Sequence, residues 1–194
     1  IDPEIITIEN GESKIVEEVV NQYNLNANYI SDKFTDEDWD QAMYHYEHPL
    51  DYGSLIPNWL LFREASNSMV LTGDGSDELF GGYKRSLYKD TFEYDFNELK
   101  FYHNIRIDRM SMAFTKEARS PLMSMALFRI AFKLQKQHRT NKKILRELYK
   151  DKLPSIILNQ EKKPLRLKNK KEFNLEECKK RFEKVWCQKK ELLQ

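Results

Sequence analysis

Residues 69–83 read Met-Val-Leu-Thr-Gly-Asp-Gly-Ser-Asp-Glu-Leu-Phe-Gly-Gly-Tyr, and they say more about the architecture than any other stretch. The apolar start predicts a short buried strand, which breaks into a turn rich in glycine and acidic residues. Gly73 and Gly75 permit positive φ and let another molecule approach bare backbone. Successive N–H groups in such a turn can bind an anion. The pattern therefore predicts a ligand site at the end of a strand, where open α/β sheets bind their ligands.

The acidic side chains of this turn suit a metal that is bound together with phosphates. Asp77 and Glu78 are hard oxygen ligands, and Mg²⁺ usually takes one or two carboxylates plus substrate phosphates. The same residue types are common in surface turns, so an ordinary structural turn is the alternative interpretation. An EF-hand calcium loop fits worse, because the acidic spacing differs and no Glu closes the loop.

The composition is that of one ordinary globular domain. The 194 residues are 40% hydrophobic and 32% charged, with a net charge of +1, which argues against a globally basic nucleic-acid binder. No run approaches the roughly 18 apolar residues of a membrane span, and no secretory signal is visible. Cys178 and Cys187 lie on one predicted helix, too far apart for a disulfide. Reduced thiols indicate a cytoplasmic protein.

Alternating strands and helices predict an α/β fold for the first half of the chain. Ile5–Ile8 and Asn28–Ile30 read as strands, and Ile15–Tyr23 between them reads as an amphipathic helix with Ser13 as a candidate N-cap. Thr35 has the character of a second N-cap. Together with the strand that begins at residue 69, this rhythm predicts a partial parallel sheet flanked by helices.

From about residue 97 the periodicity becomes helical. Apolar positions within Phe101–Met112, Leu127–Leu134 and Leu175–Trp186 recur at helical spacing, and Met110 and Met112 are predicted to fill the core. We therefore expect a sheet-containing part over about residues 1–96 and a largely helical part over about residues 97–194 of one domain.

Four groups of residues, taken in order, resemble a known family. They are His45–Pro49 with Ile56-Pro57; residues 72–83; Arg106–Ala113 with Glu117–Leu122; and Lys143–Glu147 with Leu153-Pro154 and Lys162–Pro164. The series resembles the synthetase domain of glutamine-dependent asparagine synthetases, and it is similar to their relatives, the β-lactam synthetases and lasso-peptide cyclases. The resemblance is clearest from about His45 to Leu165, and the second and third groups are specific when taken together.

The resemblance implies an α/β domain of the ATP-pyrophosphatase type, with an adenine nucleotide alpha hydrolase-like fold. Such enzymes attach AMP to a carboxylate and release pyrophosphate, and an amine or ammonia then attacks the acyl-adenylate. The implied cofactors are ATP and Mg²⁺. The implied substrate is a small molecule: aspartate, or another carboxylate or amine. This chemistry needs cations at the oxygens where negative charge develops.

The resemblance also assigns nucleotide and metal contacts to the turn. Thr72 and Gly73 match the strand-end contacts of the family to adenosine. Gly75 and Ser76 continue the predicted nucleotide contacts. Asp77 matches the carboxylate that binds Mg²⁺.

Three further positions match residues that act on the substrate. Asp74 occupies the slot beside the reacting substrate, where relatives place Glu or Tyr. Glu117 matches an acidic residue that could orient a base or the incoming amine, whereas Arg119 is better read as a structural ion-pair partner. Lys162 matches a lysine that stabilises the transition states in relatives. Lys163 is its rival, because the register is ambiguous by one residue.

Other polar features receive plainer interpretations. The lysine-rich stretch from Lys162 to Lys171 reads as solvated surface, and as an RNA-binding patch it lacks interleaved aromatic residues. The four histidines show no metal-ligand spacing and are interpreted as structural or surface residues.

Two hallmarks of the family do not occur in this sequence. One is the pyrophosphate loop, Ser-Gly-Gly-x-Asp-Ser, and the other is a glutaminase domain with an N-terminal cysteine nucleophile. We therefore expect a fragment, one half of a split enzyme that needs a complementary chain or domain, or a non-catalytic subunit that retains the fold.

Overall fold

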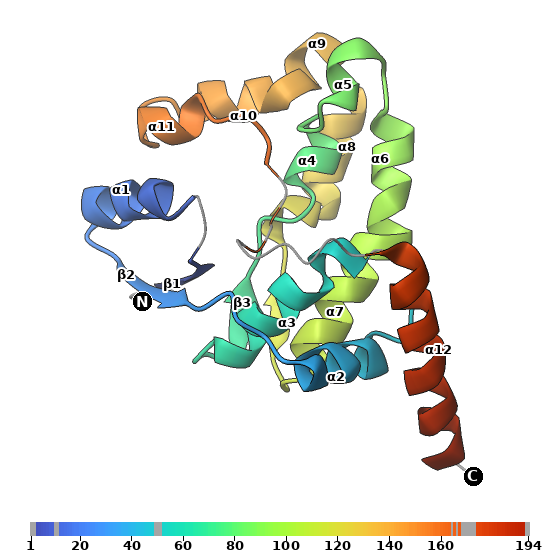
Figure 1. Ribbon diagram of the computed structural model, residues 1–194. Helices are drawn as coiled ribbons and strands as arrows, with labels where there is room; N and C mark the ends of the chain where they lie inside the picture. The colour runs from blue at the N-terminus through green and yellow to red at the C-terminus, as the bar shows by residue number, and fades with distance from the viewer. Residues whose placement is uncertain are drawn as a thin grey trace. The chain divides into compact units, whose positions relative to one another are not determined.

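The computed structural model describes residues 3–9, 12–48, 52–163, 165, 167 and 174–192. The chain forms two compact units, each assembled from separate stretches of sequence. The first contains Ile1–Ser68, Ile105–Glu117 and Leu165–Gln194, and the second contains Met69–Asn104 and Ala118–Pro164. Helices make up most of the described chain, and the strands are short (Figure 1). The sequence predicts a change from sheet-containing to helical structure near residue 97. The division of the domain into two parts at that residue stays a prediction.

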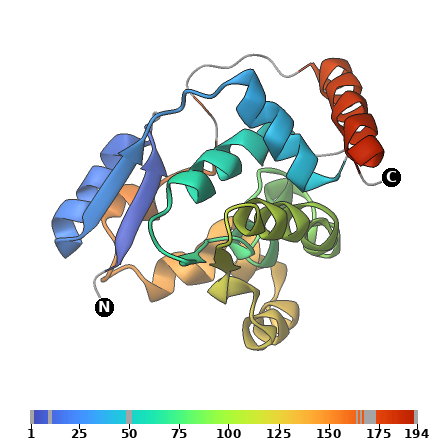
Figure 2. The same cartoon turned by 90° about the horizontal axis from the view of Figure 1, so that it is seen from below.

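A parallel pair of strands opens the first unit. β1 (Glu4–Ile8) pairs with β2 (Asn26–Ile30), with Ile8 opposite Ile30, and α1 (Ser13–Tyr23) connects them. Figures 1 and 2 show α1 beside this pair. Parallel neighbours need a crossover connection of this kind. The predicted strand–helix–strand order is therefore confirmed.

The start of α1 differs from the sequence-based expectation. Ser13 is the first residue of the helix and not its N-cap; Glu12 occupies the cap position, in helical conformation and without a side-chain cap hydrogen bond. Asn10 and Gly11, between β1 and this helix, lie outside the described residues. Asn24 ends the helix in the left-handed conformation, which Asn tolerates better than most residues.

The second helix has the start that its sequence predicts. Thr35 caps α2 (Asp36–Tyr46) with its hydroxyl, which accepts a 3.1 Å hydrogen bond from the Asp38 amide. The Asp38 carboxylate accepts in return from the Thr35 amide at 2.9 Å. This reciprocal capping box satisfies two backbone donors that the helix itself leaves unpaired.

The core of the first unit lies between α2 and α3. After a short turn of helix, η1 (Tyr52–Ser54), the chain forms α3 (Leu55–Glu64). Both helices bury apolar faces, which comprise Trp39, Ala42, Met43, Tyr46, Leu55, Ile56, Trp59, Leu60 and Phe62. The Trp59 indole N–H donates to Asp38 at 3.1 Å, so this large buried side chain has its polar atom satisfied.

Two further helices complete this unit. α7 (Asn104–Met112) buries Met110 as predicted, but Met112 is 59% exposed, so its predicted core role is wrong. The two methionines lie two residues apart, and positions so spaced face different sides of a helix. α12 (Leu175–Leu192) packs against α2 and buries Cys178. Both Cys178 and Cys187 are free thiols, as expected.

The second unit consists of short elements. Its first stretch forms β3 (Met69–Leu71), α4 (Ser76–Leu79), α5 (Arg85–Tyr88), α6 (Phe92–Glu98) and η2 (Leu99–His103). Its second stretch begins within β4 (Glu117–Arg119). It continues with η3 (Pro121–Met123), α8 (Met125–Lys133), α9 (Lys136–Arg139), η4 (Thr140–Lys142), α10 (Lys143–Leu148) and α11 (Ser155–Leu158). The α/β class with a largely helical C-terminal half is confirmed.

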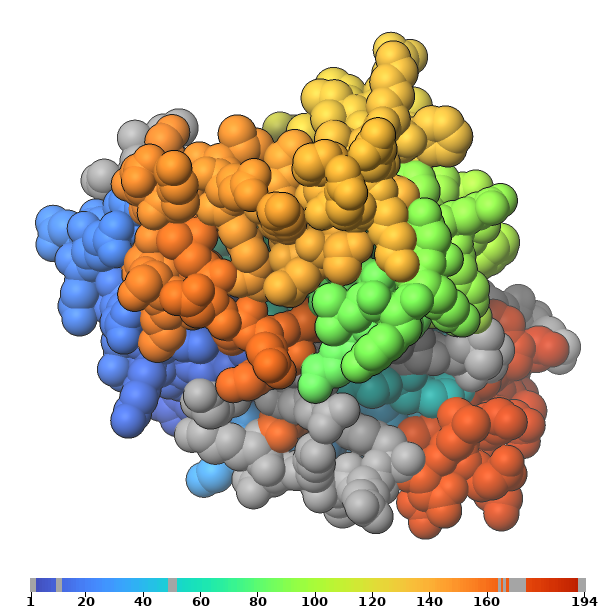
Figure 3. All heavy atoms as spheres, turned by 90° about the horizontal axis from the view of Figure 1, so that it is seen from above, coloured from blue at the N-terminus to red at the C-terminus, as the bar shows by residue number. Residues whose placement is uncertain are grey.

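A small apolar core holds these elements together. Leu79, Phe80 and Ala131 are fully buried, and partly buried side chains of α6, α8 and α10 pack around them. Phe96 and Phe128 stack with ring centroids 4.5 Å apart. The contact between α5 and η4 is visible on the surface, where green and yellow-orange atoms meet (Figure 3). The core therefore fixes α4, which follows the glycine turn.

β3 is a strand, as predicted, but it is not buried. Met69 is 49% exposed and Leu71 is 67% exposed. Residues two apart share one face of a strand, and β3 belongs to a sheet of two strands, with β4 as its neighbour. An apolar run was therefore insufficient to predict burial here, because burial depends on what covers the strand.

No helix in the described part of the chain combines the length and apolar character needed to cross a bilayer.

Candidate functional site

The turn after β3 is anchored to the segment that follows β4. The Thr72 amide donates to the Arg119 carbonyl at 2.9 Å, and the hydroxyls of Thr72 and Ser120 lie 2.5 Å apart. Gly75 precedes α4 with φ of +90°, a conformation that L side chains rarely adopt. Gly73 does not adopt the positive φ that glycine permits. It is exposed, and a Cβ added to it would meet no atom within 4 Å.

Asp77 lies between two lysines. Its Oδ1 is 2.8 Å from Lys142 Nζ and its Oδ2 is 3.0 Å from Lys162 Nζ, and the Asp77 side chain is only 13% exposed. Lys142 Nζ also donates to the Ser76 hydroxyl at 3.2 Å. Three elements distant in sequence thus deliver one carboxylate and two ammonium groups to the first turn of α4. We refer to Asp77, Lys142 and Lys162 as the Asp77 cluster.

The charge state of Asp77 follows from these contacts. Burial raises the pKa of its carboxyl, but the ammonium groups of Lys142 and Lys162 outweigh burial and lower the pKa overall. Asp77 is therefore ionised at neutral pH. The cluster carries one negative and two positive charges, which leaves a surplus positive charge for an anionic ligand.

Gly82 leaves the space in which the cluster fits. A Cβ at this position would lie 1.9 Å from Asp77 Oδ1 and 2.5 Å from Lys142 Cε, closer than any real contact. The sequence marks Gly81-Gly82 only as the end of a short apolar segment. The structure shows that the second of the two glycines is required by a side-chain contact.

Lys142 reaches Asp77 from an unusual backbone conformation. Asn141 and Lys142 both have left-handed φ, of 57° and 56°. Their amides donate to the carbonyls of Gly81 and Phe80, each at 2.8 Å, which ties this segment to the end of α4. Consecutive non-glycine residues with positive φ are costly and persist where the surroundings enforce them. Such strain is concentrated at functional sites, so we include Lys142 in the site.

Sequence reasoning missed Lys142. It directly precedes the group of matched residues that begins at Lys143, and nothing in the local pattern distinguishes the two lysines. Of the rivals Lys162 and Lys163, it is Lys162 that contacts Asp77, whereas Lys163 is exposed. The contact with Asp77 favours Lys162 over Lys163 as the position that corresponds to the lysine of the family. Arg166, Lys168, Lys170 and Lys171 of the lysine-rich stretch lie outside the described residues.

Asp74 is the second titratable group in the turn. Burial raises the pKa of its carboxyl, and a hydrogen bond from the Thr72 side chain together with the positive potential of His103 and Lys162 offsets only part of that effect. Asp74 and Asp77 thus lie three residues apart with pKa values shifted in opposite directions. His103, interpreted from sequence as structural, contributes to the electrostatics of this turn.

Glu78 does not share the environment of Asp77. It is 4% exposed and accepts a hydrogen bond from the Tyr83 hydroxyl, and its Oε1 lies 3.6 Å from His103 Nε2. The carboxylate is thereby already engaged. Of the two acidic residues considered for the metal, Asp77 is the one that faces the lysines.

Glu117 belongs to the first unit, at the end of the stretch Ile105–Glu117. Its amide donates to the Ser68 carbonyl at 2.7 Å and its side chain is exposed. Its role in the chemistry stays a prediction, as do the roles of the other residues named from sequence.

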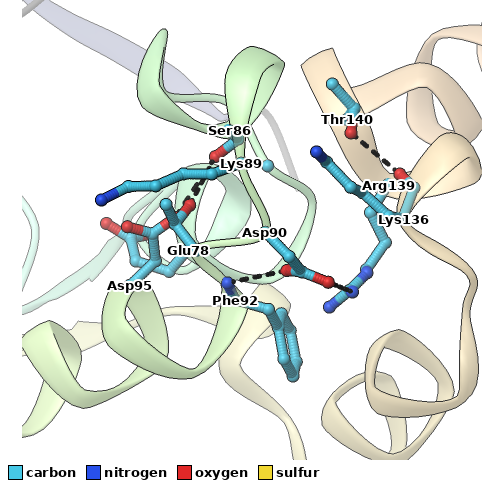
Figure 4. A pocket seen from close by; sticks show the side chains of 11 residues that line it. Glu78, Ser86, Lys89, Asp90, Phe92, Asp95, Lys136, Arg139 and Thr140 are labelled. Atoms are coloured by element: carbon cyan, nitrogen blue, oxygen red, sulfur yellow. Dashed lines mark hydrogen bonds and ion pairs between the residues drawn. The ribbon is translucent and has the colours of Figure 1, made fainter.

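A separate polar pocket lies behind α4. Glu78, Ser86, Asp90, Asp95 and Arg139 are among the residues that line it (Figure 4). Its volume of about 10 Å³ matches one water molecule and is far too small for a nucleotide. Asp95 is neutralised within it by Arg85 at 2.6 Å. The pocket is therefore structural, and the Asp77 cluster is the candidate functional site.

The residues fit a Mg²⁺ ion that is shared with phosphates. Among the described residues, no group of three or more His, Cys, Asp or Glu side chains is arranged to hold a metal. Asp77 accordingly offers one carboxylate, and Mg²⁺ commonly binds through one or two carboxylates and completes its shell with water and phosphate oxygens. The lysines beside Asp77 suit those phosphates.

The fold is α/β, and the site at the end of its third strand is a carboxylate–lysine cluster of the kind that handles anionic ligands. The family model for asparagine synthase matches residues 6–99 and 88–192 of the chain. Because these matches span nearly the whole sequence, the chain belongs to the asparagine synthase family, a ligase-type enzyme family. No curated protein matches the chain.

Proposed function

We propose that this chain forms part of the active site of an ATP-dependent ligase that makes amide bonds. In the proposed reaction a carboxylate is activated as an acyl-adenylate, pyrophosphate is released, and an amine or ammonia attacks the activated acyl group. The Asp77 cluster is the observation that carries this proposal, because adenylate formation requires cations at the departing pyrophosphate. Membership of the asparagine synthase family supports the same chemistry.

Each member of the cluster has a role in the proposal. Asp77 holds Mg²⁺, and the ion, when bound, neutralises the charge of the pyrophosphate group. Lys162 and Lys142 donate hydrogen bonds to phosphate oxygens as negative charge develops there. Both ammonium groups are aimed in advance, so little reorganisation is needed at the moment of reaction.

The proposal implies an exchange of partners at Asp77. In the structure both carboxylate oxygens already bind lysines, at 2.8 and 3.0 Å. With a divalent cation held at Asp77, Lys142 and Lys162 would donate to phosphate oxygens in place of the carboxylate. Metal and phosphate should therefore bind with positive cooperativity, because each relieves the charge that the other leaves uncompensated.

Adenosine is proposed to bind where the turn leaves backbone exposed. Thr72 and Gly73 lie at the end of β3, and Gly73 has open space beside it. Gly75 and Ser76 lead into α4. Asp74 sits within the same turn, and its raised pKa makes a protonated, hydrogen-bond-donating carboxyl more accessible than for an ordinary Asp. We propose that it contacts the small-molecule substrate, either aspartate or another carboxylate or amine.

The proposal includes a partner for the phosphate loop. These 194 residues contain no Ser-Gly-Gly-x-Asp-Ser sequence, so a complementary chain or domain would supply the loop. We propose a cytoplasmic setting, in which the free thiols of Cys178 and Cys187 stay reduced.

The direct test is substrate-dependent exchange of radiolabelled pyrophosphate into ATP, with the complementary polypeptide present. Asp77→Ala should abolish exchange. Glu161→Ala is the matched control: Glu161 is an exposed acid beside Lys162 that pairs only weakly with Lys84, at 3.8 Å, and its removal should leave exchange unchanged. Exchange that persists in Asp77→Ala overturns the proposal.

The choice of substrate identifies the kind of ligase. Exchange with aspartate indicates the asparagine synthetase reaction, and exchange with a peptide or another amino acid indicates a cyclase of the related type. If the chain with its complement binds no ATP and supports no exchange with any substrate, it is a non-catalytic subunit.

A further inference from the structure

Tyr83 connects the buried side of α4 to the Asp77 cluster. Its hydroxyl donates to Glu78, which is 4% exposed and lies 3.6 Å from His103. Burial, followed by the negative charge of Glu78, raises the pKa of the Tyr83 phenol. The phenol is thus held as a donor, and the orientation of its ring is fixed from the protein interior.

The ring of Tyr83 faces two cations. Arg85 Cζ lies 4.4 Å from the ring centroid and Lys162 Nζ lies 5.9 Å from it, both within the range of cation–π attraction. Arg85 is also held by the carboxylates of Asp95 and Glu98. Lys162 lies on a segment outside helices and strands.

In the described part of the chain, Lys162 contacts the Asp77 carboxylate and the Tyr83 ring. The proposed function assigns the first of these to a metal ion. When a divalent cation occupies Asp77, the ion pair that holds Lys162 in place would weaken, because the cation competes for the carboxylate and its positive charge repels the ammonium group. The aromatic ring is then a contact of Lys162 that does not depend on the Asp77 carboxylate.

We propose that Tyr83 is a positioning residue for Lys162: its ring, anchored through Glu78, holds the ammonium group beside Asp77 when a metal takes the carboxylate. This inference rests on the proposed function for its consequence in catalysis. The contact between the ring and the ammonium group is a separate claim, and it can be tested without turnover.

The catalytic consequence is tested with a series of rings of nearly constant size. Position 83 is changed to phenylalanine, 3,5-difluorophenylalanine and 3,4,5-trifluorophenylalanine, so that the hydroxyl is absent throughout and only the electron density of the ring varies. Fluorination weakens cation–π attraction. The rate of pyrophosphate exchange should fall stepwise, by about three- to tenfold across the series. A residue that merely fills space would give equal rates for all three rings.

Tyr94 provides the matched control. Its ring also faces Arg85, at 5.0 Å from the centroid, but it is 59% exposed, and its cation–π partner among the described residues is Arg85 and not Lys162. The same three rings at position 94 should not change the exchange rate. A stepwise fall at position 94 as large as that at position 83 would show that Arg85, and not Lys162, senses the ring, and would overturn the inference.

A double-mutant cycle of unfolding tests the contact itself. Tyr83→Leu and Lys162→Met, alone and together in the 194-residue chain, should be non-additive by about two- to fivefold in the unfolding equilibrium constant. Additive effects overturn the inference whether or not the protein turns over ATP. Non-additive effects without any exchange activity would instead retain the contact and reject the proposed function.

Discussion

The start of α2 in the first unit is stabilised by local hydrogen bonds, whereas the start of α4 in the second unit is stabilised by contacts with distant residues. At α2, Thr35 and Asp38 satisfy each other within four residues of chain, and the helix buries a regular apolar face. At α4, no side chain caps the helix; a glycine with positive φ precedes it, and Asp77 in its first turn is paired with lysines 65 and 85 residues further along the chain.

The α2 start stabilises the fold, whereas the α4 start carries the candidate functional site. The α2 start lowers the free energy of the folded state through local hydrogen bonds that need no ligand. The α4 start combines two neighbouring ammonium groups, strained backbone at residues 141 and 142, and a buried carboxylate, which depend on one another across distant segments of the chain. A site that is locally unfavourable but held by long-range contacts is what the proposed ligase chemistry requires.

The largest expected effect contrasts one glycine from each unit. Gly82→Ala places a methyl group 1.9 Å from Asp77 Oδ1, whereas Gly53→Ala in the first unit meets no atom within 4 Å. Gly82→Ala should lower pyrophosphate exchange by about 10²-fold or more and destabilise the fold by about 1–3 kcal/mol.

Gly53→Ala should leave exchange unchanged and shift the free energy of unfolding by about 0.5 kcal/mol or less. Activity assays and urea unfolding of both variants check this contrast. Equal losses in the two variants would mean that the α4 start is no more sensitive than an ordinary turn.

The next effect concerns adjacent lysines. Lys162→Met should reduce turnover by about 10²-fold, comparable to the loss of an oxyanion-stabilising donor. Lys163→Met should have little effect, because the Lys163 side chain is exposed and Lys162 is the one that contacts Asp77. Steady-state kinetics of the two variants decide the register. A large loss in Lys163→Met alone would shift the assignment by one residue.

The smallest effect is a difference in pH dependence between two carboxylates of the same turn. The pKa of Asp77 is lowered from its ordinary value of 3.8, so its contribution to stability is present above that pH and is lost as the pH falls through the folded-state pKa. The pKa of Asp74 is raised, so its contribution is present below 3.8 and is lost as the pH rises through the folded-state pKa.

The two signs can be measured in metal-free buffer. The stability difference between the unsubstituted protein and Asp77→Asn should shrink as the pH falls below about 3.8, whereas Asp74→Asn should stabilise the protein increasingly as the pH rises above about 4. Urea unfolding between about pH 3 and pH 6 gives both curves. For each variant, its free energy of unfolding is subtracted from that of the unsubstituted protein. This difference should rise with pH for Asp77→Asn and fall with pH for Asp74→Asn, and a change in the same direction for both would contradict the electrostatic account of the turn.

The sequence predicted those features that depend on neighbours along the chain. The strands Glu4–Ile8 and Asn26–Ile30, the capped start of α2 and the amphipathic α12 all follow from local periodicity and capping chemistry. Asp77 was proposed as a site residue because glycines and acidic residues cluster in one turn. The family resemblance then singled out Lys162.

The features that sequence did not predict depend on contacts between distant segments. Lys142 enters the site through left-handed backbone at residues 141 and 142, which hydrogen bonds to residues 80 and 81 enforce. Glu78 is engaged by the Tyr83 hydroxyl, and Met69, Leu71 and Met112 are exposed because no part of the described chain covers them. None of these contacts leaves a periodic signal in the sequence.

Binding of Mn²⁺, as a reporter for Mg²⁺, tests the proposed exchange of partners at Asp77 most directly. Titrations followed by electron paramagnetic resonance, with and without pyrophosphate, should show that pyrophosphate tightens Mn²⁺ binding by about tenfold or more in the unsubstituted protein. The same addition should have no effect in Asp77→Ala. Equal Mn²⁺ affinity with and without pyrophosphate, or equal behaviour of the two proteins, would contradict the account.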